Sequence, residues 1–82
     1  MATEQIGDYE ITYTGVHVPE SDGWAAWVEI FGPSPNPMHR HAVFPSQQVA
    51  VETTFGSEQE AVQAARQIAL DMVEQRHRPA SV

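Results

Sequence analysis

Hydrophobic and polar residues alternate with a period of two over residues 9–14, and residues 24–31 and 48–55 can each be divided into two strand faces at the same spacing. In stretches rich in β-branched and aromatic residues, such alternation is typical of strands with one buried face. The segment 19–23, Pro-Glu-Ser-Asp-Gly, has strong turn chemistry. We therefore predict three strands, the first two of which form an antiparallel hairpin.

A single helix is predicted from about residue 61 to residue 76, where most residues are strong helix formers. Ser57 and Glu60 before it have the spacing of a capping box. Leu70 falls outside the apolar arc of the helix, and we expect it to be exposed. The fold class is α+β: a three-stranded antiparallel sheet followed by one C-terminal helix packed on one face, β-β-β-α. The arc predicted to face the sheet contains Ala61, Val62, Ala65, Ile68, Ala69, Met72 and Val73.

The length of 82 residues indicates a single domain, residues 1–82. We expect its ordered core to run from about 8 to 77. Residues 32–46 are predicted to form a loop, because prolines lack the backbone donor that a strand ladder needs. The terminal segments 1–6 and 78–82 are predicted to be frayed.

Charge and composition narrow the classes of partner. Eleven acidic residues against four basic ones give a formal net charge of −7. This charge repels phosphate backbones and anionic lipid, so we expect no nucleic-acid partner and no membrane partner. The sequence has no cysteine, no signal-peptide pattern and no apolar stretch near the ~20 residues that span a bilayer. We expect a cytoplasmic protein.

Glu29 decides which face of the strand at 24–31 is predicted to be buried. Because burying an unpaired carboxylate is costly, Glu29 and its face-sharing neighbours Trp27 and Phe31 are expected on the side away from the helix. Aromatic residues concentrate binding energy at protein interfaces, so these three residues form our candidate partner-binding site. Alternatively, Trp27 and Phe31 pack under the loop at 33–45 or at a self-association interface. An unpaired edge strand is another place where a partner or a second copy could add.

A His-x-His pattern is the candidate metal site. In an extended segment His39 and His41 would project to the same side, about 7 Å apart. They could share a divalent metal with a third ligand from His17, His77 or a carboxylate. The alternative is two histidines in a surface loop. The sequence has no glycine-rich phosphate loop and no Gly-x-Ser-x-Gly elbow. We therefore expect no enzyme and no cofactor.

Two segments resemble the HicB-type antitoxins. They are residues 22–29, Asp-Gly-Trp-Ala-Ala-Trp-Val-Glu, and residues 55–61, Phe-Gly-Ser-Glu-Gln-Glu-Ala. Those antitoxins are small acidic β-β-β-α domains in which a segment similar to the second opens the helix. The resemblance covers about half of the chain. It implies an acidic antitoxin-like or regulatory module that binds a basic protein partner.

Residues 56–66 also resemble the last helix of double-stranded RNA-binding domains. In that family a lysine cluster at the start of the helix contacts phosphates, whereas here those positions are acidic or neutral. As a whole, the chain resembles small uncharacterised β-β-β-α proteins of Gram-negative bacteria, which implies a fold and no activity. We interpret the sequence as a non-enzymatic protein-interaction domain. The antitoxin-like module and a metal-binding protein using its His-x-His loop are the alternatives.

Overall fold

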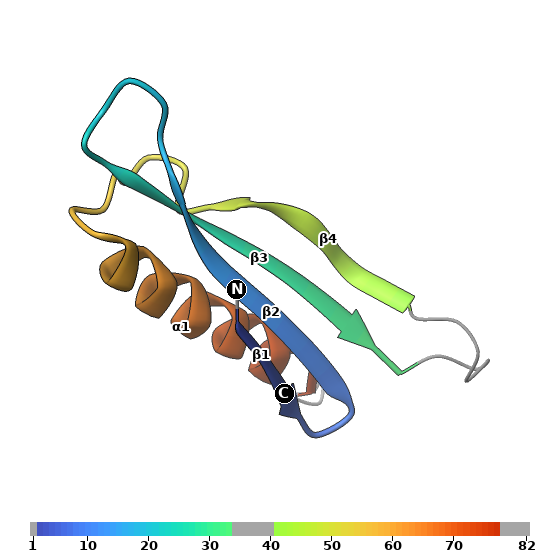
Figure 1. Cartoon of the computed structure of the whole chain (residues 1–82). Coiled ribbons are helices and arrows are strands. Elements are labelled where there is room, and N and C mark those ends of the chain that lie inside the picture. The colour runs from blue at the N-terminus through green and yellow to red at the C-terminus, as the bar shows by residue number, and fades with distance from the viewer. Residues whose placement is uncertain (1, 34–40, 78–82) are drawn as a thin grey trace.

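One helix lies across one face of a four-stranded antiparallel sheet (Figure 1). The computed structural model describes residues 2–33 and 41–77. The strands follow one another in the sheet in chain order, each antiparallel to the next. The α+β class and the single C-terminal helix are confirmed, but three strands is wrong. The elements are β1 (Ala2–Ile6), β2 (Tyr9–His17), β3 (Trp24–Gly32), β4 (His41–Val49) and α1 (Glu58–His77).

The additional strand is β1, in the segment that we expected to be a frayed tail at 1–6. Residues 2–6 pair in continuous antiparallel register with β2. Gly7 and Asp8 form the connection, and Gly7 adopts a φ of 59°. Two-residue hairpin loops require such left-handed backbone, which glycine adopts without steric cost. The Gly7-Asp8 pair was therefore a local signal for this hairpin.

The last strand lies earlier in the chain than its predicted range of 48–55. Strand β4 ends at Val49, and Ala50 has a φ of 51°, so the chain turns away from the sheet there. Contact with β3 resumes only at Phe55, which exchanges two backbone hydrogen bonds of 2.9 Å with Trp24. The strand predicted at 48–55 is therefore not continuous.

Strand β4 occupies the second half of the predicted loop at 32–46. Among the described strands it pairs with β3 alone, so it is an edge strand. Pro45 is compatible with this position because an edge strand leaves some backbone groups outside the ladder. The pairing shifts register between Val28 and Ile30, as expected of a β-bulge. Residues 34–40 of the predicted loop lie outside the described residues.

The capping box at the start of α1 is confirmed. The Glu60 backbone N–H donates a hydrogen bond to Ser57 Oγ at 3.2 Å. The Glu60 carboxylate in turn accepts from the Gly56 backbone N–H at 3.1 Å. These bonds satisfy backbone donors that have no partner within a helix, and they set its start at Glu58.

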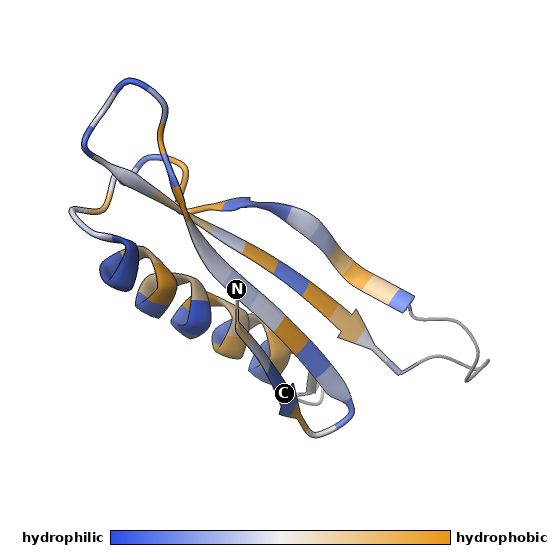
Figure 2. Ribbon diagram, in the orientation of Figure 1, coloured by the Kyte–Doolittle hydropathy of each residue, from blue (hydrophilic) through white to orange (hydrophobic). Residues whose placement is uncertain are grey.

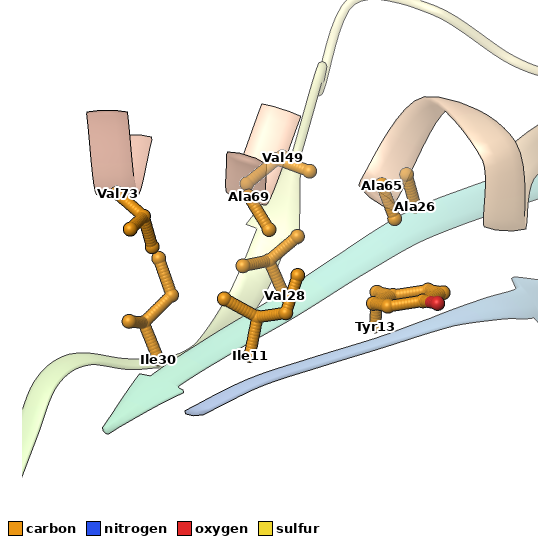
Figure 3. Packing of buried hydrophobic residues seen from close by; sticks show 9 residues of the cluster. All are labelled: Ile11, Tyr13, Ala26, Val28, Ile30, Val49, Ala65, Ala69 and Val73. Carbon is orange, nitrogen blue, oxygen red and sulfur yellow. The ribbon is translucent and has the colours of Figure 1, made fainter. Parts of the chain in front are cut away.

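Small residues form the inner stripe of α1. Ala61, Ala65 and Ala69 are completely buried. Because they are small, the sheet supplies most of the bulk in the core, notably Ile11 and Ile30. Figure 2 shows hydrophobic positions interspersed with hydrophilic ones along β3 and α1. Figure 3 shows the helix and sheet side chains of the core pointing toward one another: Ile11, Tyr13, Ala26, Val28, Ile30, Val49, Ala65, Ala69 and Val73.

Leu70 is half-buried, and our expectation that it would be exposed is wrong. It packs against the core and borders a hollow of about 450 Å³ together with Ile6 and Val73. The physical reason is β1, because this strand brings Ile6 beneath that side of the helix. The larger residues of the predicted arc, Val62, Ile68 and Met72, are also only half-buried.

A cluster of polar side chains joins β1, β2 and α1. Arg66 donates two hydrogen bonds to the Glu4 carboxylate, from Nε to Oε1 and from Nη2 to Oε2, the latter at 3.3 Å. The Tyr13 hydroxyl donates to Glu4 Oε1 at 2.6 Å. The hydrogen bonds from Arg66, and then that from Tyr13, lower the pKa of Glu4. The bond to Glu4 likewise raises the pKa of Tyr13.

Substitution of Gly15 should test how closely α1 approaches the sheet. A Cβ atom at Gly15 would lie 3.0 Å from the Glu58 carbonyl oxygen and 3.1 Å from Ala61 Cβ. We expect Gly15→Ala to lower the free energy of unfolding by about 1–3 kcal/mol, because overpacking forces the backbone to shift. Urea denaturation followed by circular dichroism measures this change. Thr14→Ala, one residue away on the opposite face, is the control and should change stability less.

The Glu4 cluster should make stability depend on pH in the acid range. Because the pKa of Glu4 is lowered in the folded protein, its ionised form is favoured by folding. This stabilisation is therefore present above the ordinary pKa of 4.5 and is lost as the pH falls through the lower, folded value. We expect Glu4→Gln to lower the Tm at pH 7 and to differ less from the wild type near pH 3. Glu52→Gln, in an exposed turn, should show no such convergence.

Candidate functional site

The sheet face opposite α1 carries the candidate site. Ala26, Val28 and Ile30 of β3 belong to the core with the helix, so the residues between them face the other way. Within the part of the chain that the structure describes, no helix or strand covers this second face. We call it the open face. From the strand register, its positions are Thr3, Gln5, Glu10, Thr12, Thr14, Val16, Ala25, Trp27, Glu29, Phe31, Ala42 and Gln48.

Trp27, Glu29 and Phe31 form a row along β3 on the open face, and all three are half-buried. Successive residues on one face of a strand are about 7 Å apart, so Glu29 lies midway between two aromatic rings. The structure thus places these residues on the side expected from the sequence. We refer to them as the aromatic–acidic row.

Polar residues border this row on β2 and β4. Trp27 lies between Thr14 of β2 and Gln48 of β4 in the strand register. Thr12 is opposite Glu29, and its hydroxyl lies 3.4 Å from that of Thr3. Aromatic rings within a polar border resemble the composition of protein interfaces, where Trp and Tyr are enriched and the rim is polar.

The surface beside Trp27 is hollowed. A hollow of about 320 Å³ is lined in part by Val16, Ala25, Trp27 and Val51. Val16 is 42% exposed and Val51 is 68% exposed, which makes them large hydrophobic side chains on the surface. The sequence analysis missed both residues. Val51 was assigned to the predicted strand at 48–55, and its exposure follows from the turn that begins at Ala50.

The structure separates the histidines of the candidate metal site. His41 is the exposed first residue of β4, opposite Gly32 at the end of β3. His17 is opposite Trp24 at the start of β3, about 26 Å away along the strand, and so cannot complete a site with His41. His39 lies outside the described residues. Within residues 2–33 and 41–77, no group of three potential ligands could hold a metal ion.

His17 instead contributes to the end of the sheet near the hollow. Its ring contacts Trp24 edge-on, with the ring centroids 5.2 Å apart and an interplanar angle of 77°. It also lines the hollow beside Trp27. His17 thus lies at the end of the sheet, in contact with Trp24 and beside the hollow.

A second hollow lies on the helix side of the sheet, between β4 and the end of α1. Its volume is about 300 Å³, and its walls are mostly apolar. It is thus on the opposite side of the sheet from the aromatic–acidic row. Its lining residues are Ile30, Val43, Phe44, Met72, Gln75 and Arg76.

Comparisons with family models, with curated proteins and with solved structures gave no match to this chain. In the described residues, no helix combines the length and the apolar character that crossing a bilayer requires. The function therefore has to be argued from the chemistry of the surface itself.

Substitutions in β3 should separate the open face from the core. Ile30 is completely buried, so Ile30→Ala should lower the free energy of unfolding by ~2–5 kcal/mol. Trp27→Ala should lower it by less than Ile30→Ala, because Trp27 is only half-buried on the open face. Chemical denaturation of the two variants measures this difference. Equal large losses would show that Trp27 is a core residue.

Proposed function

We propose that this protein is a non-enzymatic interaction domain that binds a protein partner through its open face. The observation that carries the proposal is Trp27, which is half-buried beside an apolar hollow on the sheet face opposite α1. A tryptophan in such a position can anchor a partner, because aromatic side chains bury a large area at a low cost in conformational entropy.

The open face suits a protein better than a nucleic acid. Stacking of bases on aromatic rings normally accompanies a positively charged groove that follows the phosphates. Here the described open face carries the carboxylates of Glu10 and Glu29 and no lysine or arginine. Phosphates would therefore be repelled.

The surface also favours binding over catalysis. The hollow beside Trp27 is lined mainly by apolar side chains, with Gln48 and Thr54 among its polar groups. A carboxylate such as Glu29 needs a second reactive group nearby for acid–base or nucleophilic catalysis. Its described partner in the register is Thr12, whose hydroxyl offers hydrogen bonds, and no β4 residue is in register opposite it.

Capture experiments with matched variants should test this proposal. The wild type, Trp27→Ala and Phe44→Ala serve as parallel baits in native extract. Phe44 is the control because it is also a half-buried aromatic residue but lines the hollow on the helix side. Circular dichroism confirms that each bait is folded, and mass spectrometry identifies retained proteins. A retained protein is then purified and its affinity for each bait is measured by calorimetry.

We expect a direct partner that Trp27→Ala binds at least tenfold more weakly and that Phe44→Ala binds as the wild type does. A partner that depends on Phe44 and not on Trp27 would place the binding site at the other hollow and contradict the proposal. Equal affinity for all three baits would contradict it as well.

A further inference from the structure

Glu29 lies between two aromatic residues, an arrangement that suits a positively charged ligand. Trp27 and Phe31 each lie two residues from Glu29 on the same face of β3, so each ring is about 7 Å along the strand from the carboxylate. A cation bound to that carboxylate would lie close to the ~6 Å range in which an aromatic face attracts a positive charge. The row therefore places an ion-pair acceptor next to a tryptophan ring that can form a cation–π contact.

Glu29 is available for such an interaction. Within residues 2–33 and 41–77, no hydrogen bond or ion pair involves its carboxylate. By contrast, the carboxylate of Glu4 is engaged by Arg66 and Tyr13 on the helix side of the sheet. The energetic cost of half-burying an unpaired carboxylate is reduced when a partner supplies the opposite charge.

We propose that the aromatic–acidic row, Trp27, Glu29 and Phe31, binds an arginine side chain of the partner protein. The inference rests on the proposed function and specifies the chemistry of the partner. Arginine fits better than lysine, because its planar guanidinium stacks on aromatic rings and also forms paired hydrogen bonds with a carboxylate. The apolar hollow beside Trp27 then receives a neighbouring hydrophobic side chain of the same partner segment.

The distribution of charge supports a basic partner. The chain has a formal net charge of −7. Its described arginines, Arg66 and Arg76, both belong to α1 on the other side of the sheet. Glu29 and Glu10 are both on the open face. A positively charged segment is therefore attracted to this face, and the approach is favoured over long range.

The same charges disfavour a second copy of this chain as the occupant. An isologous dimer would place identical faces together, so each Glu29 would approach acidic residues of the other copy. Like charges at an interface are costly. With two copies of charge −7, the partner of opposite charge is the occupant that the surface favours.

The pairing between β3 and β4 is irregular beside Glu29. The pairing of β3 with β4 shifts between Val28 and Ile30, and no β4 residue is in register opposite Glu29. On its other side Glu29 is opposite Thr12, whose hydroxyl can accept a hydrogen bond from a guanidinium. The irregular pairing thus interrupts the ladder beside the carboxylate that would receive the cation.

Selection from a random peptide library should test the inference. A phage-displayed library of 12-residue peptides is selected on the folded wild-type protein in 150 mM NaCl, with depletion on Trp27→Ala. We expect the retained peptides to be enriched in arginine at least threefold over the unselected library, together with a bulky hydrophobic residue. Lysine should be enriched less than arginine.

Affinities of one selected peptide should then locate the arginine. We expect Glu29→Gln to weaken binding at least tenfold. Asp71→Asn removes the same charge from α1 on the opposite side and should change the affinity less than twofold. In the peptide, the arginine is replaced with citrulline, which keeps the shape and removes the charge. This replacement should weaken binding as much as Glu29→Gln does. Combining the two changes should weaken binding little more than either change alone, because in a double-mutant cycle two groups that interact directly have non-additive effects.

Other results would contradict one or both proposals. Peptides that depend on Trp27 but lack arginine would overturn this inference and leave the proposed function standing. Equal weakening by Glu29→Gln and Asp71→Asn would show that only net charge matters and would overturn it too. Recovery of no Trp27-dependent peptide would contradict both proposals. Dimers in sedimentation that Trp27→Ala abolishes would make a second copy the occupant and overturn the assignment of a basic partner.

Discussion

The close contact between α1 and the middle of the sheet is the constraint on which the rest of this structure depends. Ala61, Ala65 and Ala69 face the sheet without exposure, and Gly15 leaves space for the backbone at Glu58. Protein interiors are packed so tightly that one added methyl group at such a contact must displace something. The core is therefore a single layer between one helix and one sheet, and its large side chains come mostly from the sheet.

A fold with one helix on a four-stranded sheet has one covered and one uncovered sheet face. In this chain the two faces differ in chemistry. The helix side has the apolar core and the ion pair of Glu4 with Arg66, which ties β1 to α1. The open face has aromatic rings, hydroxyls and a carboxylate without a described partner. The apolar core of the domain thus lies on one side of the sheet, and the proposed binding surface lies on the other.

Two independent observations favour a basic protein as the partner. One is the net charge, which acts at long range and does not depend on the fold. The other is the aromatic–acidic row, which acts only at contact. In the proposed complex the row requires an arginine in particular, because a guanidinium can both pair with Glu29 and stack on Trp27, which a diffuse positive charge cannot do.

The sequence by itself determined the features that depend on neighbouring residues. Ser57 and Glu60 defined the start of α1, and the cost of burying Glu29 oriented β3 correctly. Only the tertiary structure decided which segments became the edge strands. Residues 48–55 can place Val49, Val51 and Phe55 on one strand face, yet β4 lies earlier in the chain and leaves Val51 exposed beside Trp27. Strand pairing is decided by competition among distant segments with similar patterns, so local alternation cannot specify the register or the surface that the register creates.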